Sequence, residues 1–355
     1  MRDPRIEKLA DILVNYSAKI KKGDTVIIRG DELGKPLLLE VYRKVVEAGG
    51  NPLTSVAFEE MNKIFYDCAS EEQLSHTSRI RLYEAKNCDA VIIVHAPANS
   101  KALSAVDPSK MSLKSKANKP VSEIIVNKKR WVLTNYPTQA LAQDAEMSLD
   151  EYEEFLFSAT NLDWAKVDRE QESIKKVVDK GNTIRIVGED TDLTFSIKGR
   201  KGIKCAGGCN MPDGEIFYAP VENSANGHIY YEFPAIHGGK EVSGIRLGFE
   251  KGKVVKATAE KNEEYLFAML DTDKGARFIG EFGIGTNYGI KKFTRDILFD
   301  EKIGGTIHLA LGRSYKESGG KNDSAIHWDM IKDLRVKVTI YLDGKRIQEN
   351  GKFLI

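Results

Sequence analysis

The most suggestive chemistry in this chain lies in residues 324–330, "SAIHWDM", where one residue separates His327 from Asp329. Side chains two positions apart project from the same face of a β-strand. In a strand, the imidazole and the carboxylate would therefore converge, and Trp328 would point to the opposite face. Both groups are good metal ligands, so the spacing raises the hypothesis of a metal site. The alternative is a buried histidine bonded to a neighbouring carboxylate.

Other ligand-type residues stand among turn and strand residues of the C-terminal half. They are Glu215 in "NMPDGEIF", Glu281 in "IGEFGIGTN", and His308 and Tyr315 in "GGTIHLALGRSY". Each has a structural alternative: a turn or capping carboxylate, a core histidine, or a packed aromatic ring. If they converge with His327 and Asp329, three carboxylates and two imidazoles form a mixed oxygen and nitrogen shell that suits Zn, Co or Mn.

The charge of this set indicates how many metals it would hold. Three carboxylates and a bridging hydroxide would together offset two divalent ions. A single zinc site more usually has three protein ligands and a water. The set is too large and too acidic for one metal, so the sequence favours two.

The secondary-structure elements that must position these residues follow two sequence patterns. Residues 1–135 alternate helical patterns, such as "IEKLADILVNYSAKI" and "PLLLEVYRKVVEAGG", with the short apolar runs "TVIIRG", "LTSVAF", "DAVIIVHA" and "RWVLTNY". This alternation predicts a parallel sheet covered by helices. His95 ends the run "DAVIIVHA", at the edge of such sheets where sites often lie, although a structural role is more common.

After a helical stretch over residues 136–180, hairpin patterns take over. "NTIRIVGEDTDLTFSIKG" and "KVTIYLDGKRIQENGKF" both read as hairpins, and Asp343-Gly344 is a strong turn signal in the second. We therefore expect an α/β N-terminal domain with a parallel sheet, residues 1–160. A β-rich α+β catalytic domain, residues 161–355, would hold the metal-binding groups.

Composition excludes some classes of function. Lys and Arg number 53 against 52 for Asp and Glu, so the net charge of +1 gives no sign of a nucleic-acid partner. No apolar run approaches the roughly 20 residues of a membrane span, and the first residues lack the apolar core of a signal peptide. The four cysteines are sparse, as in a reducing compartment. The sequence thus predicts a soluble cytoplasmic protein.

Taken together, these segments resemble the thermophilic-type dimetal aminopeptidases, the family of aminopeptidase T and aminopeptidase S. The resemblance rests on "NMPDGEIF", "PVENSANG", "GARFIGEFGIGTN", "DEKIGGTIHLALGRSY" and "SAIHWD", which occur in the family's order. It extends from "LADILVNYSAKIKKGDTVIIRG" to the terminal hairpin. It implies a metal-dependent aminopeptidase that releases N-terminal residues from short peptides with a free N-terminus. It also implies a homodimer whose first domain serves as a scaffold or dimerisation element.

The resemblance also implies a ligand set. Matched segment by segment, the family's metal positions fall on residues that all keep the expected type: Glu215, Glu281, His308, Tyr315, His327 and Asp329. The implied cofactor is two divalent metal ions per chain, Zn or Co first, with Mn or Mg as alternatives. These ions would activate a bridging water, and Asp329 or Glu215 is the natural bridging carboxylate.

Three residues receive catalytic roles as hypotheses. Glu222 of "PVENSANG" would carry the proton to the leaving amine, and Arg313 or Tyr315 would stabilise the tetrahedral oxyanion. One alternative function is a dimetal amidohydrolase acting on non-peptide or N-acylated amides, which a requirement for a free amine would exclude. Another is a non-catalytic binding protein, against which the six retained ligand-type residues argue.

Overall fold

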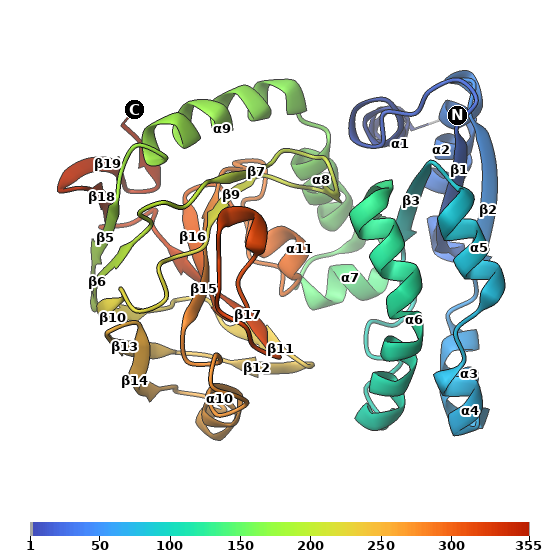
Figure 1. Ribbon diagram of the computed structural model, residues 1–355. Helices are drawn as coiled ribbons and strands as arrows, with labels where there is room; N and C mark the ends of the chain where they lie inside the picture. The colour runs from blue at the N-terminus through green and yellow to red at the C-terminus, as the bar shows by residue number, and fades with distance from the viewer. Residues whose placement is uncertain (1–2, 355) are drawn as a thin grey trace. The chain divides into compact units, whose positions relative to one another are not determined.

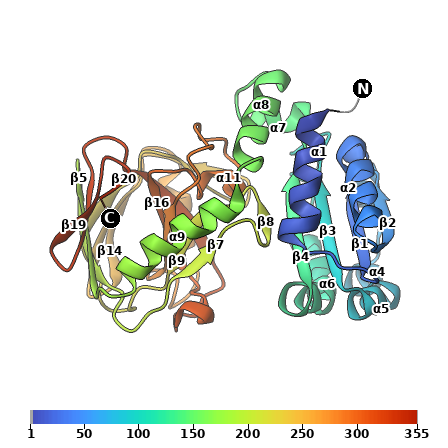
Figure 2. The same cartoon turned by 90° about the horizontal axis from the view of Figure 1, so that it is seen from above.

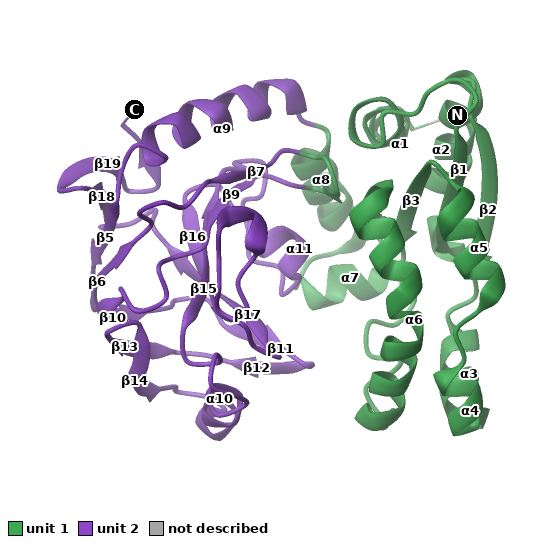
Figure 3. Ribbon diagram, in the orientation of Figure 1, with its two compact units in different colours: residues 1–161, 207–212 green, residues 162–206, 213–355 purple. Residues whose placement is uncertain are grey.

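The computed structural model describes residues 3–354, which divide into two compact units (Figure 3). The first unit extends to Asn161 and also includes Gly207–Pro212. The second comprises Leu162–Ala206 and the chain from Asp213 onward. The chain therefore passes between the units three times. No helix within residues 3–354 combines the length and apolarity that a membrane span requires.

The first unit alternates helices and strands, as Figure 1 shows. Its elements in chain order are α1 (Pro4–Asp11), the π-helix η1 (Ile12–Ser17), β1 (Thr25–Asp31), the 3-10 helix η2 (Glu32–Gly34), α2 (Lys35–Glu47), β2 (Asn51–Ala57), α3 (Glu60–Cys68), α4 (Glu71–Ser75), α5 (Arg79–Asn87), β3 (Ala90–His95), α6 (Pro108–Lys128), β4 (Arg130–Asn135), α7 (Gln139–Asp144), α8 (Leu149–Thr160) and β8 (Asn210–Met211).

The strands of this unit form one parallel sheet, sheet A, in the order β2-β1-β3-β4-β8. Helices cover both faces, α2 on one and α5 with α6 on the other (Figure 2). Ile27 and Val91 face α5 and α6, whereas Gly30 lies against Leu38 of α2. Strands covered on both faces must be apolar throughout, which explains the short apolar runs. The predicted parallel α/β architecture is confirmed.

One predicted helix changes character along its length. The periodicity over residues 6–20 predicts a single α-helix, but after Asp11 the chain continues as the π-helix η1. The backbone N–H of Ala18 donates to Leu13 O at 2.9 Å, five residues back. In the π-helix Ile12, Leu13 and Val14 are all buried, so its apolar surface is wider than the stripe of an ordinary α-helix.

The second unit is rich in strands, which confirms the β-rich α+β expectation. Its elements are α9 (Trp164–Val178), β5 (Thr183–Gly188), β6 (Thr191–Ser196), β7 (Ile203–Cys205), β9 (Glu215–Tyr218), β10 (Asn226–Tyr230), β11 (Ala235–His237), β12 (Lys240–Val242), β13 (Arg246–Glu250), β14 (Lys253–Thr258), α10 (Glu263–Leu270), β15 (Ile279–Gly285), α11 (Ile297–Asp300), β16 (Thr306–Gly312), the 3-10 helix η3 (Lys316–Ser318), β17 (His327–Asp333), β18 (Thr339–Leu342), β19 (Lys345–Glu349) and β20 (Lys352–Phe353).

Two antiparallel sheets build the core of this unit. Sheet B has the order β14-β13-β10-β6-β5-β18-β19-β20, and sheet C has the order β17-β16-β15-β9-β7. Apolar side chains of both sheets share one buried cluster with Ile174 and Val178 of α9. The rings of Phe195 in sheet B and Phe282 in sheet C lie 5.1 Å apart, edge to face. One face of sheet C is thereby committed to the core.

Candidate metal centre

Sheet C has two chemically distinct faces because side chains alternate along its strands. Ile216, Phe282, Leu309 and Trp328 belong to the core cluster. Their sequence neighbours point the other way, and these are the predicted metal-binding residues Glu215, Glu281, His308, His327 and Asp329. Trp328 thus turns away from His327 and Asp329, as expected for residues two apart on a strand.

Strand register brings these side chains together. Glu281 of β15 and Asp329 of β17 lie on either side of Ala310 of β16, which pairs with both. His308 Nε2 lies 3.2 Å from Glu281 Oε1 and 3.3 Å from Glu215 Oε2. His327 Nε2 lies 3.5 Å from Glu281 Oε2 and 3.6 Å from Asp329 Oδ1. Five groups from four strands therefore meet at one place.

Both imidazoles are oriented by main-chain carbonyl groups. His308 Nδ1 lies 3.1 Å from the carbonyl oxygen of Glu301, and His327 Nδ1 lies 2.8 Å from that of Arg313. A carbonyl oxygen only accepts, so each Nδ1 must donate. In a neutral ring, Nε2 is then an acceptor, and in both residues it faces carboxylate oxygens that also accept. Such opposed acceptors require either a proton or a metal ion between them.

A glycine makes room for one of these rings. Gly283 pairs with His308 across β15 and β16, and its missing side chain is replaced by the imidazole. A Cβ at this position would stand 2.0 Å from His308 Cε1 and 2.1 Å from Nε2. The glycines of "GEFGIG" therefore include one that is required by close approach to the site.

The buried acceptors of the site are not satisfied by the protein. Among the described residues, none donates a hydrogen bond to the buried atoms Glu215 Oε2 and Asp329 Oδ1. Burial raises the pKa of Glu215 well above its usual value and that of Asp329 to about 6. Although burial opposes it, the hydrogen bond to Glu281 and the charge of Glu215 raise the pKa of His308 to about 10. In the absence of metal, protons take the place of a cation here.

Two further charged groups belong to this cluster and were missed by sequence reasoning. Ligand atoms of Glu301, Glu215 and His308 all lie within 4.8 Å of one another. Lys302 is completely buried, forms an ion pair with Glu301 and lies 3.9 Å from Glu215 Oε1. The signal was present in "DEKIGGTIH", where an acid and a lysine directly precede the glycine turn that leads into the strand of His308.

Tyr315 lies beside the cluster. It precedes η3, and its ring centroid is 5.1 Å from the His327 ring and 5.3 Å from the Phe217 ring. Burial raises the pKa of its phenol, and the nearby charges of Glu281 and Asp329 raise it further. The hydroxyl therefore keeps its proton at neutral pH and can donate a hydrogen bond.

The other two predicted catalytic residues make different contacts. The Glu222 carboxylate accepts from Arg200 Nη2 at 2.8 and 3.0 Å and from the backbone N–H of Lys321 at 2.8 Å. Arg313 contributes its carbonyl group to His327, while its side chain is exposed. The contacts of the described residues thus tie Glu222 to Arg200 and not to the cluster, and the roles predicted for Glu222 and the Arg313 guanidinium stay predictions.

Comparisons with known proteins point in one direction. A family model described as thermophilic metalloprotease (M29) matches residues 2–353. The chain is 28% identical to "Aminopeptidase T" of Thermus thermophilus over 99% of this chain and 98% of that one. It is 27% identical to "Aminopeptidase 2" of Geobacillus stearothermophilus, over 97% and 96% of the two chains. The solved structure of wild-type AmpT from Thermus thermophilus superposes with a TM-score of 0.85 at 24% identity, covering 99% of both chains.

Proposed function

The chain belongs to the thermophilic metalloprotease (M29) family and is a metal-dependent aminopeptidase, and we propose that it holds two divalent metal ions on the polar face of sheet C. The facing acceptors carry this proposal. The Nε2 atoms of His308 and His327 face carboxylate oxygens, and the buried atoms Glu215 Oε2 and Asp329 Oδ1 receive no hydrogen bond from the described residues. Bound cations would satisfy all of them at once.

The charge of the cluster supports two ions. Four carboxylates surround the site, and Lys302 is the buried ammonium among them. Three negative charges remain, and a bridging hydroxide makes four, which two divalent cations balance. The carboxylates are those of Glu215, Glu281, Glu301 and Asp329. A mixed shell of imidazole and carboxylate suits Zn or Co, with Mn or Mg as alternatives. Metal analysis after reconstitution should give about two ions per chain, and one ion per chain would contradict the proposal.

Each side chain then has a place in hydrolysis. We assign Glu215, Glu281, His308, His327 and Asp329 as metal ligands, with Glu215 or Asp329 as the bridge. When bound, two divalent ions supply a water of lowered pKa and a Lewis acid for the scissile carbonyl group. The Tyr315 hydroxyl would donate a hydrogen bond to the tetrahedral oxyanion, or would bind metal directly.

The proton carrier is best assigned to Glu301. Its carboxylate lies next to Glu215 and His308, and the ammonium of Lys302 helps to lower its pKa against the effect of burial. Glu301 would accept the proton of the attacking water and return it to the leaving amine nitrogen. Glu301→Gln should lower kcat at least about 100-fold while metal stays bound. The matched variant is Glu222→Gln, and a larger loss there would return the role to Glu222.

The substrates are peptides, and we propose short ones with a free N-terminus. The free α-amine of the substrate would bind one of the metal ions or a carboxylate of the cluster, and this anchoring would restrict cleavage to the N-terminal residue. Leucyl amide and its N-acetylated form separate this function from the dimetal amidohydrolase alternative. We expect cleavage of the free amine only. Equal rates on both would favour the amidohydrolase.

We also propose that the protein is a homodimer whose interface covers the β2 edge of sheet A. Strand β2 is an edge strand, and large apolar side chains are exposed on β2, on the neighbouring helix α2 and on the segment that follows β2. They include Leu39, Tyr42, Leu53, Val56 and Phe58. An exposed apolar patch beside an open strand edge is typical of an interface. Val56→Lys should convert the dimer to a monomer in light scattering, and an unchanged mass would exclude this edge.

We propose a cytoplasmic location because the four cysteines are free thiols. No disulfide joins any of the four, all of which are described. This suits a reducing compartment. Fractionation of the native host should recover the activity with cytoplasmic markers.

A further inference from the structure

A second cluster of carboxylate and imidazole groups lies in the first unit, at the carboxyl ends of β1 and β3. Sheet A has the order β2-β1-β3, so the chain leaves β1 in one direction and returns on its other side to form β3. Ligands of open parallel sheets bind outside the carboxyl ends of the strands at such a reversal. Asp31 is the last residue of β1, and His95 is the last residue of β3.

The loop after β3 is fixed by hydrogen bonds to two carboxylates, one at the end of β1 and one after β2. Asp31 Oδ2 accepts the backbone N–H of Ala96 at 2.8 Å and lies 3.2 Å from His95 Nδ1. The Glu59 carboxylate accepts the backbone N–H groups of Ala98 and Asn99, the latter at 3.0 Å. The loop is therefore fastened from two sides, and the hollow beneath it is formed in advance.

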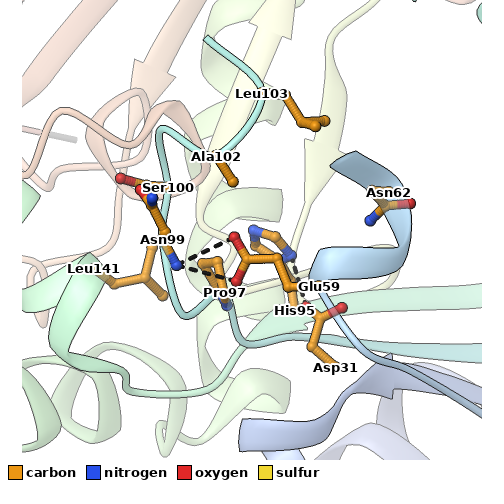
Figure 4. Close-up of a pocket in the computed structure, with 10 residues that line it drawn as sticks. All are labelled: Asp31, Glu59, Asn62, His95, Pro97, Asn99, Ser100, Ala102, Leu103 and Leu141. Atoms are coloured by element: carbon orange, nitrogen blue, oxygen red, sulfur yellow. Dashed lines mark hydrogen bonds and ion pairs between the residues drawn. The ribbon is translucent and has the colours of Figure 1, made fainter. Parts of the chain in front are cut away.

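This hollow is a pocket of about 230 Å³ with a polar and an apolar part (Figure 4). Asp31, His95 and Glu59 gather at one end, and Leu103 and Leu141 line other sides. Sites for drug-sized ligands measure about 300–1,000 Å³. The pocket is smaller than this, so it suits a molecule of few heavy atoms and not a nucleotide.

The charge of the lining selects the chemistry of the ligand. Two carboxylates line the pocket, and none of its described lining residues is a lysine or an arginine. Lys101 belongs to the same loop, but its Nζ forms an ion pair with Asp144 Oδ1 at 3.6 Å. The hydrogen bond with His95 lowers the pKa of Asp31, so that carboxylate is charged at neutral pH. Phosphates and carboxylates are therefore disfavoured, and a cation is favoured.

The side chains of the pocket favour an organic cation over a metal ion. The groups of three metal-ligand side chains found among residues 3–354 both lie in the second unit, so Asp31, His95 and Glu59 do not form one. An ammonium group needs acceptors but no fixed coordination shell. The leucine side chains offer a surface for a short hydrocarbon chain.

We propose that this pocket binds a small primary ammonium compound with a short aliphatic chain. The ammonium lies beside the carboxylates of Asp31 and Glu59, and the chain packs on Leu103 and Leu141. The site is independent of the metal centre. Simple aliphatic amines have this chemistry without the carboxylate that the lining disfavours, and the experiment separates them from free amino acids, which carry one.

Hydrogen–deuterium exchange of the full-length, metal-loaded protein tests the proposal because it reports where a ligand binds. The probe is 3-methylbutylamine, with 3-methylbutan-1-ol and 3-methylbutanoate as neutral and anionic controls of the same shape. We expect saturable protection of peptides covering residues 96–103 by the amine only. No protection, or equal protection by either control, would overturn the proposal. L-Leucine identifies the source: protection by it indicates amino acids, and its absence indicates amines without a carboxylate.

Substitutions locate the site. Leu103→Lys places a competing ammonium in the pocket from a half-buried position, and it should abolish the protection, whereas Leu103→Met should preserve it. Asp31→Asn should weaken binding about tenfold. Because Asp31 also accepts from Ala96, its variant could loosen the loop, and the lysine variant does not carry this ambiguity. Full binding by Leu103→Lys would place the ligand elsewhere.

Discussion

The carboxylate–histidine cluster on sheet C and the one at the end of sheet A are built in opposite ways. On sheet C, the buried oxygens Glu215 Oε2 and Asp329 Oδ1 receive no hydrogen bond from the described residues. At the end of sheet A, Asp31 and Glu59 both accept backbone N–H groups. The pKa values differ accordingly: burial raises that of Asp329 to about 6, whereas the hydrogen bond with His95 lowers that of Asp31.

The sheet C cluster therefore needs a cation, whereas the sheet A pocket can bind one but does not need it. Burying a carboxylate without a partner costs free energy that only a proton or a metal ion recovers. A carboxylate that already accepts from the main chain stays charged without an external ligand. The sheet C cluster should therefore depend on its cofactor for stability, and the sheet A pocket should not.

The largest effect is expected from removing one charge of the sheet C cluster. Asp329→Asn should lower kcat/KM more than about 100-fold and reduce the metal content per chain, since loss even of groups that only support metal ligands costs 10–100-fold. Asp333→Asn is the matched control on the same strand, where Asp333 pairs with Arg335 instead. Metal analysis and peptide hydrolysis on one preparation check both variants. Full activity in the Asp329 variant would remove it from the ligand set.

Adding a methyl group at Gly283 should disturb the same cluster through the His308 ring. Gly283→Ala would push the His308 ring from its place, so metal affinity should fall roughly 10–100-fold in a competition with a chelator. Gly248→Ala in β13 serves as the control, because its Cβ would meet only Lys256, with the Lys256 Cβ at 3.3 Å and the Lys256 carbonyl oxygen at 3.9 Å. Equal metal binding in both alanine variants would show that the ring does not need this gap.

The buried lysines allow the electrostatic part to be isolated. Lys302→Met removes the ammonium beside Glu301 and Glu215, and metal affinity should rise about tenfold because the cluster gains one uncompensated negative charge. Lys332 of β17 is equally buried but pairs with Glu232. Lys332→Met should lower stability without changing metal affinity. If both variants lose metal equally, general loosening and not local charge is the cause.

Metal removal should give the sheet C cluster a pH dependence of stability. In the metal-free fold the pKa of Asp329 is raised from 3.8 to about 6, so its contribution is present below about pH 4 and is lost as pH rises through 6. The melting temperature of the chelated protein should therefore fall by roughly 5 °C between pH 5 and pH 7.5, and added Zn or Co should cancel this fall. A chelated protein with a flat profile would show that these carboxylates are satisfied without metal.

The smallest effect should come from the sheet A pocket and have the opposite sign. The lowered pKa of Asp31 contributes stability above its unfolded value of 3.8, which is lost as pH falls through the folded value. Asp31→Asn should therefore lower the melting temperature at pH 7 by about 2 °C and have little effect near pH 3. The metal content should not change.

Local patterns were sufficient for much of the fold. Asp343-Gly344 predicts the terminal hairpin, and both residues adopt positive φ, 49° and 81°, as a type I′ turn requires. The alternation of Val336 to Leu342 predicts a strand, but β18 begins only at Thr339 and Val336 is exposed. Side-chain alternation identifies a strand better than its ends, because pairing partners decide where the ladder stops.

The candidate site depended on information that no single segment holds. His327 and Asp329 can be placed on one face by their spacing, whereas the approach of Glu281 depends on the register that sets Ala310 between two strands. Glu301 and Lys302 lie in the turn before β16, where no periodicity marks a side chain as buried. The family resemblance supplied the ligand set, but the counter-ion became visible only in three dimensions.

The return of Gly207–Pro212 to the first unit has a consequence for how the protein is made. β8 completes sheet A, yet it is synthesised more than forty residues after Asn161, when α9 and the first hairpin of the second unit have already been synthesised. The N-terminal unit therefore cannot finish folding before part of its neighbour exists. A gene fragment that ends at residue 161 would lack its last strand and leave β4 as an open edge.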